Sequence, residues 1–325
     1  MRKTRRTFVK QGLLAGSALL PVGAAGAVSA QPGQASPRSA AERFRGLLEG
    51  PDVLQCPVVF DALSAKMSED LGFPAIFAGG QPVSASMYGV GDFGSLTMTE
   101  LVEFAGRMAG VVDIPVVGDA DDGGGNPLNV YRTIQSYERV GVASVMIEDM
   151  YGAKHLPGLP EGPMTEIPAF TDKIKAAADA RKHGLVLIAR SDALSAKEPF
   201  EKGVERLAAY SEAGADVVFL AGAPIPRTPE LARATNRPVM TVTMPANPDS
   251  SPEVLRSSGV KIACYAYQLM AVAMGAVQKA LRDIQTTGRI QNFEEVAVTS
   301  AEYARIVGAA DAVEIARRFN AGGAY

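Results

Sequence analysis

The segment at residues 116–126, VVGDADDGGGN, places three aspartates within four positions and follows them with three glycines. Asp119 and Asp121 come at the end of an apolar run, and Glu148 stands at the end of the next apolar run along the chain. Acidic side chains this close raise one another's pKa and destabilise a fold unless a cation lies among them. Because oxygen ligands without His or Cys suit a hard ion, we predict that Asp119, Asp121 and Glu148 hold Mg²⁺ or Mn²⁺.

Two other interpretations of this segment are weaker. The acids could merely cap the helix that follows, but one capping residue is enough, and Asn126 before Pro127 suits that position. Residues 119–130 also begin like a calcium loop, yet Val130 stands where the bidentate glutamate belongs. The segment therefore favours the magnesium or manganese site.

Three further residues carry groups that could act on a substrate. Arg190 closes a later apolar run, LVLIAR, and would present a fixed cation to a substrate carboxylate. Asp92 lies in GVGDFG, which matches a dinucleotide fingerprint in letters but follows no buried strand, so Asp92 is kept as a loop acid facing the site. His155, in the loop after Glu148, either reaches the site or is an exposed histidine. A Ser-His-Asp hydrolase has little support, because the other histidine, His183, stands at a helix end.

Eight short apolar runs would position these side chains. They lack the alternation of half-exposed strands and are followed by helical patterns, which is typical of parallel strands buried on both faces. Eight such units predict an α/β fold, a (β/α)8 TIM barrel, with a doubly wound sheet as the alternative. The active site of such a barrel forms at the strand ends, where the acids and the arginine stand. The runs are 57–60, 75–79, 115–119, 144–149, 185–190, 216–222, 237–243 and 260–265.

The predicted barrel spans residues 46–290. The stretch 268–289 has the pattern of a long helix and 292–319 that of further helix, which is more than a barrel needs for closure. We expect the helical extension at 291–325 to pack on the outside of the barrel or on a neighbouring subunit. Residues 31–45, with several Pro, Ser and Gln, are expected to form a flexible lead.

Residues 1–30 have the pattern of a twin-arginine export signal. Arg5 and Arg6 precede a short apolar run that is broken by Pro21, and small residues end it at Ala30. The run falls short of the roughly 20 residues that span a bilayer. We therefore expect a periplasmic or extracellular protein whose mature form has no membrane span. The chain has a net charge of −3, and loss of these residues, which hold five basic side chains and no acid, makes nucleic acid an unfavourable partner.

The sequence has two cysteines, Cys56 and Cys264. Cys56 comes at the entry of the first predicted strand and Cys264 near the exit of the last, and a parallel barrel places those ends on opposite faces. Because a disulfide needs Cα atoms within about 7 Å of each other, we predict two buried free thiols.

Five segments together resemble the isocitrate lyase and phosphoenolpyruvate mutase superfamily, most closely its methylisocitrate lyase and oxaloacetate-type lyase branch. They follow one another in the order and spacing of that superfamily. The resemblance implies a (β/α)8 barrel, Mg²⁺, and a homotetramer built as a dimer of dimers that exchange the eighth helix. The segments are FDALSAKMSEDLGFPAIFAGG (60–80), GDADDGGG (118–125), NVYRTIQSYERVGVASVMIED (129–149), HLPG (155–158) and LIARSDAL (187–194).

The resemblance also implies roles for single residues. It places the superfamily's metal acids on the same three carboxylates that we assign to the cation, and an active-site aspartate on Asp92. The arginine that binds the substrate carboxylate falls on Arg190. The Ser-Gly-Gly turn for that carboxylate falls on Gly79, Gly80 and Gln81, where the N–H donors remain and the serine hydroxyl is lost.

The chain departs from the superfamily pattern in several loops. GAKH (152–155) replaces a KRCGH loop and has no cysteine, so the usual general acid for the leaving group is missing. Ala221 stands in place of a glutamate, and TVTMPANP (241–248) has no match for an asparagine. Asp122 and Gly124 replace a threonine and an aromatic residue, which predicts a roomier site.

These patterns together predict a Mg²⁺-dependent lyase or decarboxylase that breaks a C–C bond of a small 2-oxo or 2-hydroxy dicarboxylate through an enolate. Asp92 or His155 would move protons. Two alternatives stay open. One is cleavage or rearrangement of a P–C bond in a phosphonopyruvate-like substrate, and the other is a non-catalytic carboxylate-binding protein on the same barrel.

Overall fold

The computed structural model describes residues 38–244 and 250–319 of the 325 in the chain. The predicted export signal at 1–30 lies outside the described residues. So does the first part of the predicted flexible lead.

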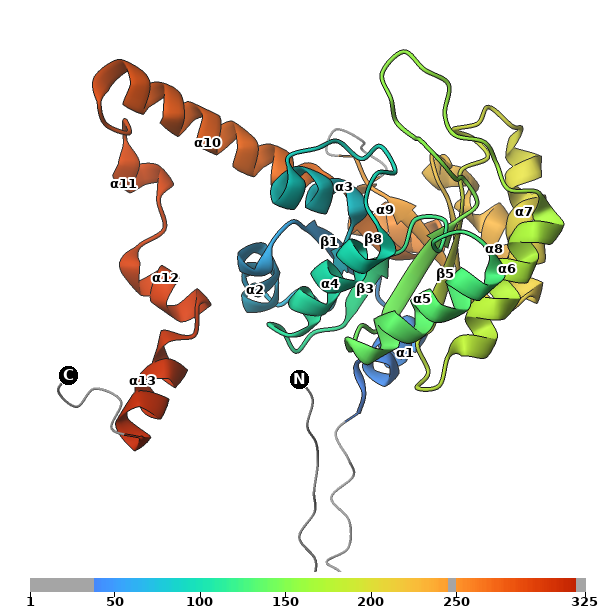
Figure 1. Ribbon diagram of the computed structural model, residues 1–325, viewed down its shortest axis with the longest axis horizontal. Coiled ribbons are helices and arrows are strands. Elements are labelled where there is room, and N and C mark those ends of the chain that lie inside the picture. The colour runs from blue at the N-terminus through green and yellow to red at the C-terminus, as the bar shows by residue number, and fades with distance from the viewer. Residues whose placement is uncertain (1–37, 245–249, 320–325) are drawn as a thin grey trace, which may run out of the picture. The chain divides into compact units, whose positions relative to one another are not determined.

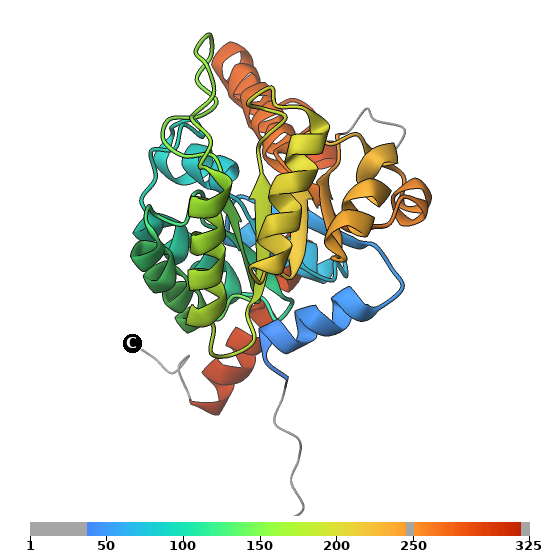
Figure 2. The same cartoon turned by 90° about the vertical axis from the view of Figure 1, so that its right-hand side faces the viewer.

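Eight parallel strands close into a barrel in the order of the sequence, with helices packed around it (Figures 1 and 2). The predicted TIM barrel is confirmed, and each of the eight apolar runs overlaps a strand. The strands are β1 (Leu54–Val59), β2 (Ile76–Ala78), β3 (Val116–Asp119), β4 (Ser144–Glu148), β5 (Val186–Ser191), β6 (Val217–Leu220), β7 (Val239–Val242) and β8 (Val260–Tyr265).

Neighbouring residues of each strand face two separate cores. In β4, Met146 packs inside the barrel, whereas Val145 and Ile147 pack against the surrounding helices. Burial on both faces explains why the runs are apolar throughout and show no alternation. The layers hold the strands in fixed register, so the residues at their carboxyl ends are rigidly placed.

The helices between the strands begin at clear sequence signals. Asn126 caps α5 by accepting hydrogen bonds from the backbone N–H groups of Leu128 and Asn129, as we expected for the residue before Pro127. The helices around the barrel are α2 (Ala62–Asp70), α3 (Gly80–Val83), the π-helical turn η1 (Ser84–Tyr88), α4 (Met98–Ala109), α5 (Pro127–Arg139), α6 (Ile167–Ala180), α7 (Phe200–Glu212), the 3-10 turn η2 (Ile225–Arg227), α8 (Thr228–Thr235) and α9 (Pro252–Ser257).

The end of the predicted flexible lead is helical instead. Helix α1 (Ala40–Glu49) begins with a capping box, in which Ser39 and Glu42 each accept a hydrogen bond from the other's backbone N–H. Phe44 is buried in the core inside the barrel, beside Leu54 and Cys56. A composition rich in Pro and Ser at the start of the segment concealed this amphipathic turn.

Cys56 and Cys264 lie side by side in neighbouring strands, whereas we expected them on opposite faces of the barrel. Strand β1 begins three residues earlier than the apolar run at 57, so Cys56 lies inside the strand and is the register partner of Cys264 in β8. Both thiols are buried and unpaired in this structure. Burial raises the pKa of Cys56 well above its ordinary value and that of Cys264 to about 12, which keeps both protonated.

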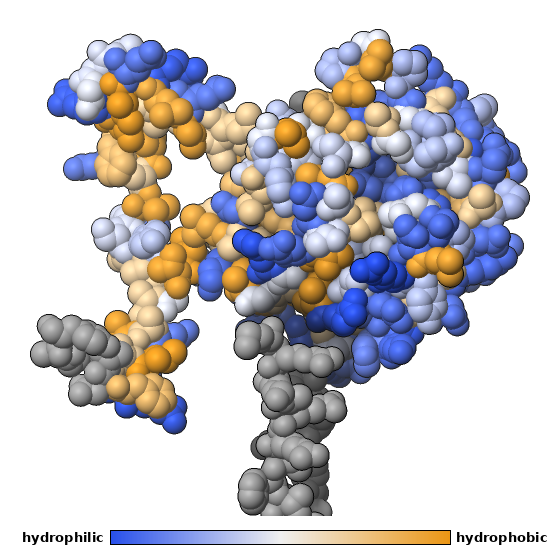
Figure 3. All heavy atoms as spheres, in the orientation of Figure 1, coloured by the Kyte–Doolittle hydropathy of each residue, from blue (hydrophilic) through white to orange (hydrophobic). Residues whose placement is uncertain are grey.

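Within the described residues, which end at 319, four helices follow the last strand, as we expected for the helical C-terminal part of the chain. They are α10 (Gln268–Thr287), α11 (Phe293–Val296), α12 (Ser300–Ile306) and α13 (Ala309–Arg318). In α10, which is described in full, Met270 is the one buried residue. Figure 3 shows apolar side chains gathered along these helices, and those exposed on α10 include Val272, Val277 and Leu281. Among the described residues, no helix is both long and apolar enough to cross a membrane.

Candidate active site

The ends of three neighbouring strands bring the predicted charged residues together. Asp119 is the last residue of β3, Glu148 is the last residue of β4, and Arg190 is the register partner of Glu148 in β5. All three side chains are largely buried. The predicted convergence at the carboxyl rim is therefore what the structure shows.

Hydrogen bonds to two backbone carbonyl oxygens fix the loop that carries the aspartates. The hydroxyl of Tyr137 donates to the carbonyl oxygen of Asp119, and the N–H of Glu148 donates to the carbonyl oxygen of Asp121 at 2.8 Å. Asp121 has a φ of 43°, in the left-handed region that a non-glycine residue adopts only when its surroundings hold it there. The loop is thus built to keep the Asp121 carboxylate at one place.

Lys154, which the sequence analysis did not select, lies at the centre of the cluster. Its Nζ is 2.6 Å from Oδ1 of Asp121 and 2.8 Å from Oε1 of Glu148, and its side chain is 4 % exposed. It belongs to GAKH, the segment that we noted only for its missing cysteine. Its position could have been predicted from the sequence, because a lysine in the loop directly after a strand that ends in acids lies close to those acids.

The acids outnumber the cations that face them. Burial, together with the charge of Asp121, raises the pKa of Asp119 to about 7 even with Lys154 nearby. Burial also raises the pKa of Asp121. Burial acts in the same direction on Glu148, but Arg190 and Lys154 together lower the pKa of that carboxyl. The cluster therefore has an excess of negative charge, which a further cation would stabilise.

Arg190 is held between two carboxylates. Its Nη1 lies 2.9 Å from Oε2 of Glu148, its Nη2 donates to Oδ1 of Asp192 at 2.7 Å, and its guanidinium lies 5.6 Å from the ring centroid of Phe219. In the described part of the chain, Nε of Arg190 and Oδ2 of Asp192 have no hydrogen-bond partner. Unpaired buried polar atoms at this point indicate a group that a ligand completes.

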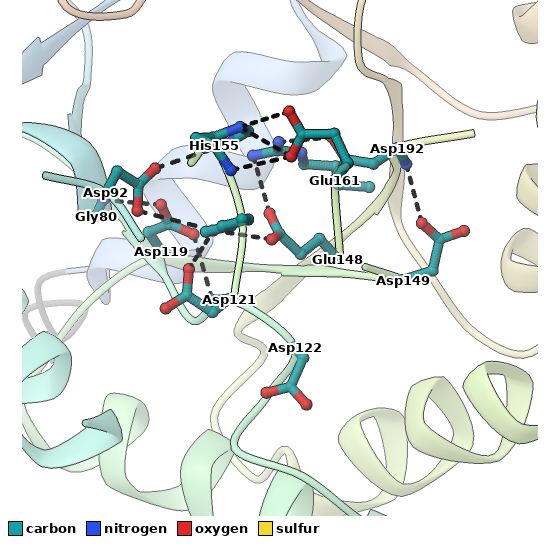
Figure 4. Close-up of polar contacts among 12 residues, drawn as sticks. Gly80, Asp92, Asp119, Asp121, Asp122, Glu148, Asp149, His155, Glu161 and Asp192 are labelled. Carbon is teal, nitrogen blue, oxygen red and sulfur yellow. Dashed lines mark hydrogen bonds and ion pairs between the residues drawn. The ribbon is translucent and has the colours of Figure 1, made fainter. Parts of the chain in front are cut away.

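The predicted loop acid and histidine lie above the cluster (Figure 4). Nε2 of His155 is 3.9 Å from Oδ2 of Asp92, and its Nδ1 is 3.4 Å from Oε2 of Glu161. His155 is 38 % exposed, so it stands at the surface of the site and still reaches it. Glu161 was missed because it belongs to the far side of the same loop, six residues along.

One cavity of about 810 Å³ at the mouth of the barrel gathers most of the predicted residues. We call it the mouth cavity. Its wall includes Gly79, Gly80, Gln81, Asp92, Asp119, His155 and Arg190. The N–H of Gly80 donates to Oδ2 of Asp119 at 2.8 Å, so this donor of the predicted carboxylate turn is engaged with the acid in this structure.

A second cavity, of about 1150 Å³, lies on the other side of the cluster, between α4 and α5. We call it the side cavity. Asp121, Glu148 and Lys154 line it, and so does Gly124, at a φ of 86°. A Cβ on Gly124 would lie 2.6 Å from Cγ of Met98, so only glycine fits there. The acids are thus reachable from two sides.

Asp122 does not join the cluster. In Figure 4 its side chain points away from the other acids, and Lys173 lies 3.2 Å from its Oδ2. Asp61, which also follows a strand, caps α2 through the N–H of Ser64. Only some of the acids at strand ends therefore share the site.

The site fits a divalent cation by the chemistry of its donors. Asp119, Asp121 and Glu148 supply carboxylate oxygens alone, and Lys154 stands among them as a positive charge. Within residues 38–244 and 250–319, however, no three His, Cys, Asp or Glu side chains surround one point as metal ligands do. The ammonium group of Lys154 lies between the acids, so a metal could be held only after that group moves.

A buried network behind the rim fixes the end of β5. Asp149 is fully buried, and its carboxylate accepts hydrogen bonds from Ser191, from the N–H of Asp192 and from the hydroxyl of Tyr210. Burial raises the pKa of Asp149 to about 6, although these donors act in the opposite direction. Arg206 lies 3.5 Å from the same carboxylate. The network holds the segment that carries Arg190.

Replacing Tyr210 by phenylalanine should destabilise the fold by about 1–2 kcal/mol, because the buried Asp149 carboxylate loses a hydroxyl donor. Urea unfolding of purified protein measures this loss. Tyr303→Phe, at an exposed position, is the control and should change stability by less than about 0.5 kcal/mol. Equal stability of the two variants would contradict a structural role for the network.

Comparison with known proteins adds three findings. A family model described as phosphoenolpyruvate phosphomutase matches residues 44–285. The chain is 32 % identical over 268 residues to a 2-methylisocitrate lyase of Aeropyrum pernix, which covers 82 % of this chain and 86 % of that one. It is 35 % identical over 246 residues to an oxaloacetate decarboxylase of Rhodopseudomonas palustris, which covers 73 % and 82 % of the two chains.

Solved structures agree with the sequence comparison. A phosphonopyruvate hydrolase in complex with oxalate and Mg²⁺ superposes with a TM-score of 0.75 at 28 % identity, over 86 % of this chain and 99 % of the other. The barrel fold is therefore shared with this hydrolase.

Proposed function

The chain belongs to the phosphoenolpyruvate mutase and isocitrate lyase superfamily and is a carbon–carbon lyase, and on that premise we propose that it acts on a small 2-oxo or 2-hydroxy dicarboxylate with Mg²⁺ or Mn²⁺. The observation that carries the proposal is the geometry of the rim. Asp121, just after β3, and Glu148, at the end of β4, both pair with the ammonium group of Lys154, and Glu148 also pairs with Arg190, which lines the mouth cavity.

Each residue then has a definite task. Asp119, Asp121 and Glu148 hold the cation, which when bound supplies positive charge beside the substrate oxygen where negative charge develops. Arg190 binds a substrate carboxylate, since this arginine is part of the wall of the mouth cavity. Gly79 and Gln81, in the wall of the mouth cavity, offer backbone donors to the same carboxylate, whereas the N–H of Gly80 donates to Asp119.

The bond that breaks leaves its electron pair on one fragment as an enolate, which must then take up a proton. Asp92 and His155 line the mouth cavity and are 3.9 Å apart, so they are the candidates for moving that proton. The general acid expected of such lyases has no counterpart in GAKH, and the substrate therefore differs from one that needs a cysteine at this place.

Two other functions remain as alternatives. The similarity to a phosphonopyruvate hydrolase supports P–C chemistry on a related substrate. The altered residues after β4, β6 and β7 support a non-catalytic protein that binds carboxylates, because Ala221 brings no charge to the mouth cavity. Both alternatives use the same acids and the same arginine.

One screen separates the three functions. Purified protein with Mg²⁺ is incubated with oxaloacetate, malate-type, isocitrate-type and phosphonopyruvate compounds, and pyruvate and phosphate are measured together. Release of a 2-oxo acid without phosphate supports the lyase. Phosphate release supports P–C cleavage, and oxalate binding without any turnover supports the binding protein.

We also propose that the protein is exported by the twin-arginine route and assembles as a homo-oligomer, a dimer of dimers. The exposed apolar side chains of α10 support assembly, since they would be covered by another subunit. Light scattering of the full chain should give a mass of four subunits. A Leu281→Glu variant should give a smaller species, and an unchanged mass would argue against this surface as the contact.

A further inference from the structure

Lys154 occupies the place that the proposed cation needs. Its Nζ lies within hydrogen-bond distance of Asp121 and Glu148, which come from two different strand ends. The third acid, Asp119, lies close enough for its charge to act on the same lysine. A divalent ion held by these oxygens and an ammonium group cannot share that space.

Charge balance makes the two cations interchangeable. Three buried acids with no cation among them would repel one another strongly, so the cluster is stable only when some positive group is present. Lys154 provides that group in the protein without metal. It is attached to the chain, so it is present at all times and needs no ion from solution.

The segment that carries Lys154 is tied at its base, and the N–H of Lys154 donates to the carbonyl oxygen of Phe93 at 3.4 Å, so a displacement has to come from the lysine side chain. Met150 and Met164 form an antiparallel bridge, and the N–H of Tyr151 donates to the carbonyl oxygen of Pro163. The loop between them, residues 151–163, contains no strand or helix. The side cavity adjoins the lysine and provides space into which it can withdraw. Asp92, whose Oδ1 is 3.9 Å from Nζ, is the nearest carboxylate outside the three acids.

We propose that Lys154 is a tethered cation that competes with the divalent metal for Asp121 and Glu148 and that its ammonium group withdraws into the side cavity when the metal binds. This inference rests on the metal site of the proposed function. The metal affinity of the protein then depends on how well the ion competes with the ammonium group of Lys154. The GAKH segment, which lacks the cysteine of the superfamily's loop, would thus act in metal loading.

Amine labelling of the unmodified protein tests the displacement. Mn²⁺ occupancy is followed by electron paramagnetic resonance, and the acetylation of each lysine is measured by mass spectrometry with and without Mn²⁺. Lys154 should be nearly unreactive without metal and at least about tenfold more reactive at saturation, because its ammonium group leaves the carboxylates. Lys173, a second buried lysine that is paired with Asp122, should not change.

A pair of variants tests the competition. Lys154→Met should bind Mn²⁺ at least about tenfold more tightly than the unmodified protein, whereas Lys173→Met should bind it as the unmodified protein does. Equal affinity of all three proteins, or unchanged labelling of Lys154 at full Mn²⁺ occupancy, would overturn the inference and leave the metal site intact. Absence of Mn²⁺ binding in every protein would overturn the metal site of the proposed function as well. If Lys154→Met does not fold, the labelling result alone decides.

Discussion

Replacing Asp121 by asparagine should lower kcat/KM by about 10³-fold, the size of effect that follows the loss of a main electrostatic stabiliser of a transition state. The change keeps the size of the side chain but removes one of the charges proposed to hold the cation. Mn²⁺ affinity, measured by electron paramagnetic resonance, should fall together with activity. Steady-state kinetics on the substrate found in the screen measures the change in kcat/KM.

Asp122→Asn is the matched control for this prediction. Asp122 is the next residue of the same loop, but its side chain points away from the cluster and accepts a hydrogen bond from the N–H of Gly124, which asparagine can also accept. Activity should stay within about threefold of the original, as for a change outside the site. Similar losses in both variants would mean that the loop matters for folding and that Asp121 has no special place in it.

Replacing Arg190 by glutamine should have the largest effect on stability. Glu148 and Asp192 are buried, and each forms an ion pair with the guanidinium group of Arg190. Loss of one partner of a buried ion pair costs about 3–5 kcal/mol, since it leaves uncompensated charge in the interior. Activity should be lost as well, because the arginine is the proposed ligand of the substrate carboxylate. Urea unfolding and kinetics measure the two losses separately.

A second variant separates the two roles of Arg190. The double change Arg190→Gln with Asp192→Asn removes one of the uncompensated acids, so stability should recover in part while activity does not. Arg190→Lys keeps the charge but not the forked geometry of the guanidinium group. This variant should raise KM clearly while its free energy of unfolding falls less than that of Arg190→Gln. Recovery of full activity in the double variant would show that the arginine acts on the fold alone.

The barrel could be predicted because burial on both faces of a parallel strand leaves a clear pattern. Each of the eight apolar runs overlaps a strand, and three of the acids at or just after strand ends, Asp119, Asp121 and Glu148, meet at one rim. What the pattern could not supply was the exact start of β1. That difference of three residues moved Cys56 from the edge of the barrel to a position beside Cys264.

The site was predictable for strand ends and less so for loops. Asp119, Glu148 and Arg190 are fixed by the register of three strands, so sequence position alone determines where they lie. Lys154 and Glu161 are placed by the irregular segment after β4, and the contacts of such a segment follow from tertiary packing and from no local periodicity. The start of α1 at Ser39 was missed for a different reason, because the residues just before it have the composition of a linker.

The most direct test of the account is the metal dependence of C–C bond cleavage. Protein freed of metal by a chelator is incubated with the 2-oxo and 2-hydroxy diacids, with and without Mn²⁺, and the products are followed by NMR above a background of metal without protein. Products should form only when Mn²⁺ is present, about 10³-fold more slowly with Asp121→Asn and at a near-normal rate with Asp122→Asn. Equal product formation by the metal-free protein, or no product from any diacid while oxalate still binds, would contradict it.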